Sequence, residues 1–336
     1  MKKNILTILL LGLLVSCNNA NSTIISEDTS SNEETSSSED SSILIQESST
    51  VANYDPISVL CPTGAPSLAF YNHLDDNNFT TNSNPANIVS SMTKNGTDLV
   101  VIDLLKGVQA INNGAPYKLA SCLTFGNFYI ASTGNDTNET MDKDDNIIIF
   151  GKGQTPDYLF KYLYGEDYTN IEYVDNVQAA AKCLISGKNA DMSKDVSYVF
   201  IAQPVLLQAM SQNEKVKVYA NIQDLYYEKS QSSMFQAGLF VKNDLVNKDV
   251  NTYLSTLESD VNLLLGKDSE TLNKINSYDD DAFTNKYGVK KQIVEKTIDK
   301  NLMGLGFKYV SEVKNDVNKF LKIFNLEIKD ENIYQK

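Results

Sequence analysis

The spacing of hydrophobic and polar positions changes repeatedly along the chain from about residue 54 onward. Runs of β-branched and apolar residues, typical of strands, occur at 57–61, 98–102, 118–123 and 128–132. The first two runs are each followed by a helical pattern, at 67–74 and 104–112. Strands that alternate with helices in this way predict α/β units built on a parallel sheet.

A second series of the same kind follows a polar break at 133–146. Its expected strands cover 147–150, 171–174, 196–200 and 216–220. Its expected helices cover 157–164, 177–186 and 204–211. A strand at 237–242 is expected to return to the first series, and residues 246–324 are mainly amphipathic helix.

The N-terminal segment, MKKNILTILLLGLLVSC, has the pattern of an export signal. Lys2 and Lys3 precede an apolar run at 5–15, which is too short to span a bilayer. The run ends in Leu-Val-Ser-Cys and resembles a bacterial lipobox, which implies cleavage before Cys17 and a lipid on Cys17. The alternative is an ordinary signal peptide that happens to contain a cysteine.

Residues 18–53 are mostly Asn, Ser, Thr, Glu and Asp and include no lysine. Such a segment buries too little apolar surface to fold, so we expect a disordered acidic tether. A lipidated Cys17 followed by this tether predicts a protein on the outer, extracytoplasmic face of a bacterial membrane. The lipid would be its only attachment to the membrane.

Composition narrows the classes of function. The 336 residues carry 43 acidic against 29 basic side chains, and every basic one is lysine. The net charge of −14 argues against a nucleic-acid partner. The absence of arginine removes the planar group that grips carboxylate, phosphate or sulfonate in a bidentate manner. A single histidine, His73, argues against a metal site, and we expect no metal and no cofactor.

Catalytic patterns are weak in this chain. No G-x-S-x-G, H-E-x-x-H or P-loop motif occurs. Cys61 and His73 form the only conceivable Cys/His pair, but His73 lies about three helical turns beyond the strand that ends at Cys61. Buried free thiols are the expectation for Cys61, Cys122 and Cys183. We therefore expect a protein that is not an enzyme.

Four segments together resemble a family. They are ISVLCPTGAP at 57–66, DLVVID at 98–103, NVQAAAKCLISGKNAD at 176–191 and AQP at 202–204. Their order and spacing are similar to type II periplasmic solute-binding proteins of ABC importers, in the nitrate/sulfonate/taurine and thiamine-precursor branch. The likeness covers about residues 55–325. It implies a monomer with two α/β lobes, a ligand cleft and a helical C-terminal part, served by a membrane permease and its ATPase.

The resemblance also implies domain boundaries. Lobe one would comprise 54–132 and 236–336, lobe two 146–222, and the crossing segments 133–145 and 223–235. In open parallel sheets, ligands bind beyond the carboxyl ends of the strands. This rule, together with the place where the chain returns to lobe one, selects the candidate ligand-binding residues. They are Thr63, Gly64, Ala65, Ser67, Asp103, Thr124, Gly126, Asn127, Phe128, Gly153, Gln154, Thr155, Gln203 and Phe235.

The chain departs from the family where an anionic ligand would be held. It has no arginine, and Gln203 stands where the family often has Glu before Pro. We therefore expect a neutral or cationic organic ligand, with Asp103 as its cation partner or hydrogen-bond acceptor. Each candidate also has a structural alternative: Asp103 as a helix cap, Gly64 and Gly153 as turn residues, and the aromatic residues as core.

Two other classes of function remain open at this stage. The chain could be a surface adhesin or structural lipoprotein without a transport role, or a surface enzyme. Reversible binding of a small molecule would favour the receptor, and turnover of one would favour the enzyme. The absence of both would favour the adhesin.

Overall fold

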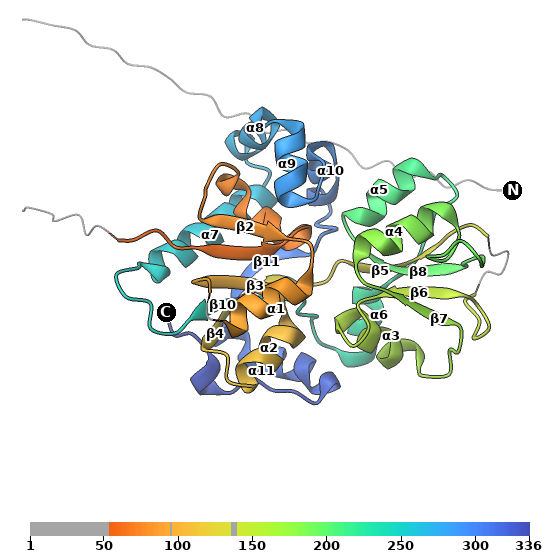
Figure 1. Cartoon of the computed structure of the whole chain (residues 1–336), viewed down its shortest axis with the longest axis horizontal. Helices are drawn as coiled ribbons and strands as arrows, with labels where there is room; N and C mark the ends of the chain where they lie inside the picture. The colour runs from red at the N-terminus through yellow and green to blue at the C-terminus, as the bar shows by residue number, and fades with distance from the viewer. Residues whose placement is uncertain (1–53, 95, 136–139) are drawn as a thin grey trace, which may run out of the picture. The chain divides into compact units, whose positions relative to one another are not determined.

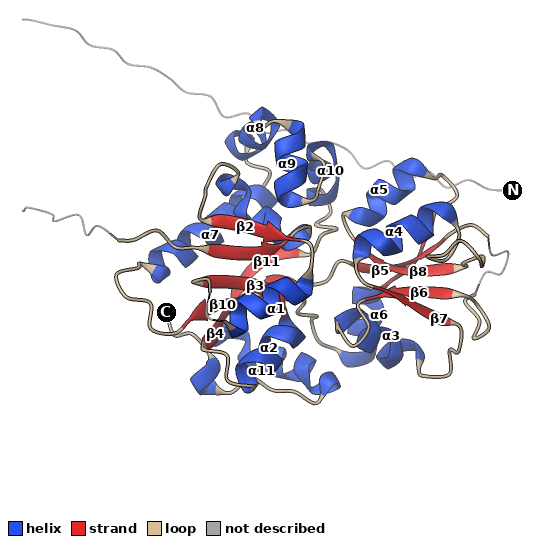
Figure 2. Ribbon diagram, viewed as in Figure 1, coloured by secondary structure: helices blue, strands red, loops and turns tan. Residues whose placement is uncertain are grey.

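The computed structural model describes residues 54–94, 96–135 and 140–336. The export signal, Cys17 and the acidic segment expected to be a tether lie outside the described residues. Within the described part, no helix combines the length and apolar character needed to cross a membrane. The described chain contains two separate β-sheets, each flanked by helices (Figures 1 and 2).

The first sheet has six strands in the order β11-β4-β10-β3-β1-β2. The strands are β1 (Val59–Pro62), β2 (Phe79–Asn82), β3 (Leu99–Asp103), β4 (Tyr117–Thr124), β10 (Ala237–Lys242) and β11 (Leu305–Tyr309). β1 pairs in parallel with β2 and β3, and Val59 lies opposite both Phe79 and Leu99. β10 runs antiparallel to β3 and β4, so the returning segment lies in the middle of this sheet.

Helices cover both faces of the first sheet. They are η1 (Ala65–His73), α1 (Pro85–Thr93), α2 (Leu104–Asn112), α7 (Val250–Leu265), α8 (Ser269–Ser277), α9 (Asp280–Tyr287), α10 (Lys291–Ile298), α11 (Val310–Leu321), η2 (Lys322–Phe324) and η3 (Asp330–Asn332). Alternate residues of β3 belong to different cores. Val100 and Ile102 pack with α1, α2 and α11, and Leu99 and Val101 pack with η1, α7 and α9. Burial on both faces explains the continuous apolar run of this strand.

The second sheet has five strands in the order β7-β6-β8-β5-β9. Its elements are β5 (Phe128–Ser132), β6 (Ile147–Phe150), α3 (Thr155–Tyr164), β7 (Ile171–Val174), α4 (Val177–Ser186), β8 (Tyr198–Ala202), α5 (Val205–Gln212), β9 (Lys217–Asn221) and α6 (Ile222–Ser230). β6 is parallel to β7 and β8, whereas β5 is antiparallel to β8 and β9. The two parallel pairings bring the carboxyl ends of three strands to one edge.

The chain passes between the sheets at places that differ from the expected segments. β4 belongs to the first sheet and β5 to the second, so the first passage is at 125–127 and not at 133–145. α6 contacts α3, β5 and β9, so it belongs with lobe two, and the return passage is at 231–236. Lobe two therefore begins at Phe128. The expectation failed because the four residues between the expected strands 118–123 and 128–132, Thr-Phe-Gly-Asn, also fit a hairpin turn within one sheet.

Candidate functional site

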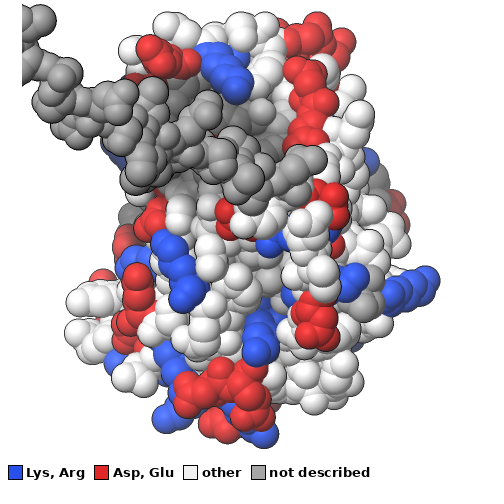
Figure 3. Space-filling model, turned by 90° about the vertical axis from the view of Figure 1, so that its left-hand side faces the viewer, with Lys and Arg blue, Asp and Glu red and all other residues white. Residues whose placement is uncertain are grey.

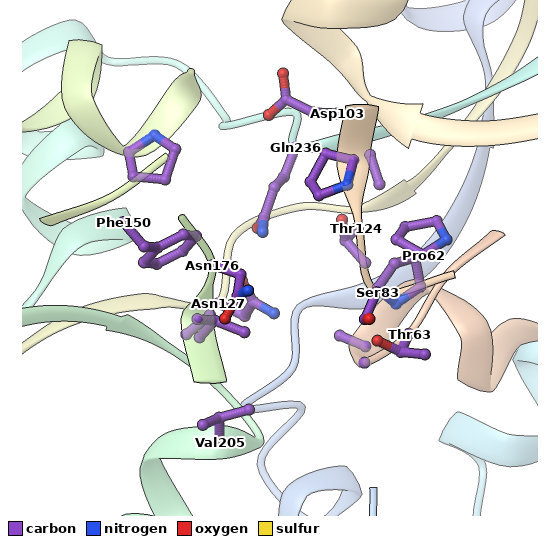
Figure 4. Close-up of a pocket in the computed structure, with 18 of the residues that line it drawn as sticks. Pro62, Thr63, Ser83, Asp103, Thr124, Asn127, Phe150, Asn176, Val205 and Gln236 are labelled. Carbon is purple, nitrogen blue, oxygen red and sulfur yellow. The ribbon is translucent and has the colours of Figure 1, made fainter. Parts of the chain in front are cut away.

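One cavity is lined by residues that follow the strands of both sheets (Figure 4). Its volume is about 170 Å³. An engineered apolar cavity of about 150 Å³ binds benzene, so the space fits a molecule with about one ring. Lobe one contributes the ends of β1, β3 and β4, and lobe two contributes the ends of β6, β7 and β8. The cavity lies where the strand-end rule places a ligand site.

The structure brings most of the predicted residues together. Nine of them line the cavity: Thr63, Gly64, Ala65, Asp103, Thr124, Asn127, Phe128, Gln154 and Gln203. The other five, Ser67, Gly126, Gly153, Thr155 and Phe235, are not part of the lining.

Three of the five support the backbone of the site. The Ser67 hydroxyl donates to Gly64 O at 2.8 Å and to Tyr287 O at 3.1 Å, which ties the turn after β1 to α9. The Gly153 N–H donates to the Asp157 carboxylate at 2.8 Å. Gly126 lies in the passage between the sheets, with a positive φ of 112°. These residues therefore shape turns beside the cavity.

The other two are buried behind the cavity wall. Phe235 is 1% exposed, and its ring packs against Phe125 and Phe320 at centroid distances of 5.7 and 6.3 Å. It is a core residue, which is the commoner role of an aromatic side chain. Thr155 is fully buried at the first turn of α3, and its hydroxyl is close enough to the Asp103 carboxylate to lower the pKa of that group.

Asp103 is a helix cap, the structural alternative considered for it, and it also lies in the cavity lining. It is the last residue of β3 and the N-cap of α2, where its carboxylate accepts a hydrogen bond from Lys106 N at 3.1 Å. Burial raises the pKa of Asp103 above its usual value, against hydrogen bonds and the Lys106 charge, which lower it. A carboxylate removed from water without a close cation is costly unless a ligand supplies the missing charge.

The described cavity lining contains two carboxylates, Asp103 and Asp175, and neither lysine nor histidine. The lysines lie elsewhere: on the face shown in Figure 3, they are interspersed with acidic side chains. The electrostatic character of the lining therefore differs from that of the mixed surface.

Three buried polar oxygens of the lining have no hydrogen-bond partner. They are Thr124 Oγ1, Asn127 Oδ1 and Gln236 Oε1. The orientation of Asn127 is set by its amide nitrogen, which donates to Gln203 O at 2.8 Å and leaves Oδ1 as a free acceptor. A buried polar group without a partner costs about 1–3 kcal/mol. Unpaired oxygens around one cavity mark positions that a polar ligand can satisfy.

Aromatic and proline rings form the apolar part of the wall. Phe150, the last residue of β6, is partly exposed and meets Phe128 edge-to-face at a centroid distance of 6.0 Å. Five prolines also line the cavity: Pro62, Pro66, Pro85, Pro156 and Pro204. These rigid rings lose little conformational entropy on binding and favour a flat ligand body.

Asp157 holds the turn between β6 and α3. Besides Gly153 N, its carboxylate accepts from the Tyr173 hydroxyl at 2.8 Å and pairs with Lys161 at 3.1 Å. Burial opposes its ionisation, but these three partners together hold the pKa of Asp157 below its usual range. The side chain fixes the backbone that carries Gln154 into the cavity wall.

The missed lining residues include Phe150, Asn176 and Gln236. The strand-end rule points to two of them, because Phe150 ends β6 and Asn176 follows β7 by two residues. Gln236 precedes β10, an antiparallel strand, so its position depends on a topology that spacing alone does not give. Among the described residues, no group of three or more His, Cys, Asp or Glu side chains has the geometry of a metal site.

Comparisons by sequence find no matching family model and no matching curated protein. Solved structures do match in fold. An ABC transporter protein from Parabacteroides distasonis aligns with a TM-score of 0.64 and 18% identity over 83% of this chain and 99% of its own. The periplasmic aliphatic sulphonate-binding protein SsuA of Escherichia coli aligns with a TM-score of 0.58 and 13% identity, covering 84% and 93%.

The alkanesulfonate-binding protein SsuA of Xanthomonas axonopodis pv. citri, bound to MOPS, gives a TM-score of 0.59 and 14% identity over 81% and 94%. At these identities the likeness concerns the fold. The two sheets, the two passages between them and the cavity at the strand ends agree with it. The chain has the two-lobed α/β fold of the periplasmic solute-binding proteins of ABC importers.

Proposed function

We propose that this chain is the receptor of an ABC importer and binds one small organic molecule, neutral or cationic, in the cavity between its lobes. The observation that carries the proposal is the cavity at the converging strand ends, with its unpaired oxygens and rigid apolar walls. A ligand there touches residues of both lobes. It therefore favours whichever lobe arrangement makes more of these contacts.

The receptor role needs no catalytic residue. A membrane permease would take the ligand from the receptor, and the ATPase of the importer would supply the energy. One receptor molecule is sufficient to bind one ligand, so we propose that the receptor is a monomer.

We further propose that Cys17 carries a lipid that holds the receptor on the extracytoplasmic face of the membrane. The support is the order of apolar run, small residue and cysteine at 5–17. An anchor raises the effective concentration of receptor near the permease. Palmitate labelling in the native host should mark the wild-type chain and not Cys17→Ala. Labelling of both chains, or of neither, would contradict the anchor.

Thermal denaturation of the purified Cys17→Ala chain against a panel of metabolites tests the receptor function. The panel includes thiamine, its pyrimidine precursors, riboflavin, purines, polyamines, taurine and nitrate. A ligand at 100 times its Kd adds about 2.7 kcal/mol to the unfolding free energy. We expect stabilisation by one compound, recovered chemically unchanged. Conversion of that compound would indicate an enzyme, and no stabilisation by any compound would favour an adhesin.

A further inference from the structure

The N-termini of the helices around the cavity are the first feature that restricts the ligand. Helix N-termini are ready-made anion sites when their N–H groups point at a ligand without partners. Here several of these donors are already used within the protein. Four caps occupy them: Asn84 accepts from Ala86 N at 2.9 Å, Asp103 from Lys106 N at 3.1 Å, Asn176 from Ala179 N at 2.9 Å and Gln203 from Leu207 N at 3.1 Å.

The turn before α3 follows the same pattern. Its Gly153 N–H donates to Asp157, a side chain of the protein itself. An anion in the cavity would have to compete with these internal acceptors. It would also lie beside Asp103 and Asp175, with no lysine in the described lining to offset them. Like charges in a site shielded from water repel strongly.

Some polar groups of the lining can pair with a ligand that donates hydrogen bonds. Asp103 presents a carboxylate, and Asn127 Oδ1 is an acceptor because its amide nitrogen is bound to Gln203 O. Thr124 and Gln236 can each donate or accept. Asn127 Oδ1 and Gln236 Oε1 are therefore acceptors that a ligand N–H group can satisfy. A ligand with several N–H groups and a positive charge would satisfy Asp103 and Asn127 together.

The aromatic part of the lining favours a ligand with a flat body. Phe150 exposes part of its ring to the cavity, and a cation near an aromatic face gains about 0.5–2 kcal/mol. The volume of about 170 Å³ leaves room for about one ring.

Building on the receptor function proposed above, we infer that the cavity binds a small planar organic cation, of the amidinium or protonated amino-heterocycle class. Its charged N–H groups face Asp103 and Asn127, and its ring lies against Phe150. This ligand class differs from the sulfonates named for two of the structural neighbours.

Three probes of one shape and different charge test the inference: benzamidine, benzamide and benzoate. Calorimetry with the purified Cys17→Ala chain, at neutral pH and low salt, gives their affinities. We expect benzamidine to bind about tenfold more tightly than benzamide, with benzoate weakest. Benzoate binding as tightly as benzamidine overturns the inference, as does failure of benzamidine to bind at roughly 10 mM, a concentration at which even millimolar affinity is detected.

Asp103→Asn is the decisive variant, because asparagine caps a helix as well as aspartate and α2 should keep its cap. It should reduce benzamidine binding to the level of benzamide. Asp249→Asn is the matched control, since Asp249 caps α7 by accepting from Thr252 N at 3.0 Å and lies outside the cavity lining. The control should keep the preference for benzamidine. An Asp103→Asn chain that also keeps it would overturn the inference.

The pH dependence of benzamidine affinity provides a second test of the inference. The charged groups to consider for Asp103 are Lys106 on its own helix and Asp175, the other carboxylate of the described lining. Protonation of Asp103 competes with the cation, so benzamidine affinity should fall by up to about tenfold per pH unit below the raised pKa of Asp103. Asp103→Asn should lack this dependence. The metabolite panel tests the receptor function separately: a stabilising anion would refute the inference and leave the receptor standing.

Discussion

Two aspartates at opposite ends of β3, one buried and one partly buried, show how the partners of a carboxylate decide its role. Asp98, which precedes the strand, is 7% exposed and accepts from Ser58 N and Ser58 Oγ, both at 2.8 Å, and from Lys248 Nζ at 2.5 Å. Asp103, the last residue of the strand, lacks such a cation. Burial opposes ionisation of both, but Lys248 and Ser58 hold the pKa of Asp98 below its usual range.

We therefore predict that Asp98→Asn lowers the unfolding free energy by about 1–3 kcal/mol at neutral pH. Because the folded-state pKa of Asp98 is lowered, its contribution is complete above the unfolded value of about 3.9 and is lost as the pH falls through the folded value. Urea unfolding at neutral pH and at about pH 3 should show the difference between wild type and variant shrinking in acid. A difference that is the same at both pH values would contradict the ion pair.

Asp103→Asn is the control for Asp98→Asn, because it makes the same chemical change at the other end of β3. It removes a buried charge without a close cation and keeps the α2 cap, so stability should stay the same or rise. The contrast also marks the limit of sequence reasoning at this scale. The strand-end rule found Asp103, Asn127 and Gln203, but residue type alone does not tell which of their polar atoms already have partners in the fold.

At the scale of elements, spacing predicted most strands of both sheets, including the edge strands β7 and β9, and missed two edge strands of the first sheet. The expected strands at 147–150, 171–174 and 237–242 match β6, β7 and β10 in their bounds. β2 and β11 were not anticipated. β2 is a four-residue edge strand, and β11 contains a glycine and pairs only with β4. β2 has a single apolar residue, Phe79, and β11 lies in a region whose apolar spacing otherwise indicates helix.

The passage between the lobes depends on two glycines in different elements. Phe125 N donates to Gly304 O at 2.7 Å, and a Cβ added to Gly304 would lie 2.0 Å from Gly126 O. Gly304 also has a positive φ of 57°. The loop before β11 thus packs backbone to backbone against the passage, next to the cavity residues Thr124 and Asn127. No residue with a side chain fits there without displacing the passage.

A side chain in the left-handed conformation alone costs about 1–2 kcal/mol. We predict that Gly304→Ala lowers the unfolding free energy by more than this amount. It should also weaken ligand binding, because the displaced passage carries Asn127. The matched control is Gly114→Ala, since Gly114 has a φ of 93° and nothing lies within 4 Å of its added Cβ. Urea unfolding and calorimetry measure both effects. Equal destabilisation by the two variants would mean that the close approach is unimportant.

At the scale of the molecule, the cavity draws residues from both sheets, and aromatic contacts already join the lobes on one side. Tyr158 of α3 meets Phe324 of η2 at a centroid distance of 5.4 Å, and Tyr226 of α6 meets Phe320 of α11 at 5.5 Å. Within the described residues, the chain passes between the lobes at 125–127 and at 231–236. The sequence predicted two lobes through a family resemblance. It did not assign β5 to the second sheet, because that assignment depends on pairing with β8 and β9, which are distant in sequence.

Two short passages and a shared cavity predict that ligand binding shifts the lobes toward a closed arrangement. Small-angle X-ray scattering should therefore record a smaller radius of gyration when the Cys17→Ala chain is saturated with the compound that stabilises it. The same compound should leave the scattering of Asp103→Asn unchanged at a concentration where that variant does not bind. Compaction of both chains would indicate an effect of the solution and not of the site. Tight binding without compaction would mean that the lobes are already closed before the ligand enters, and that release to a permease, not capture, requires the lobes to move.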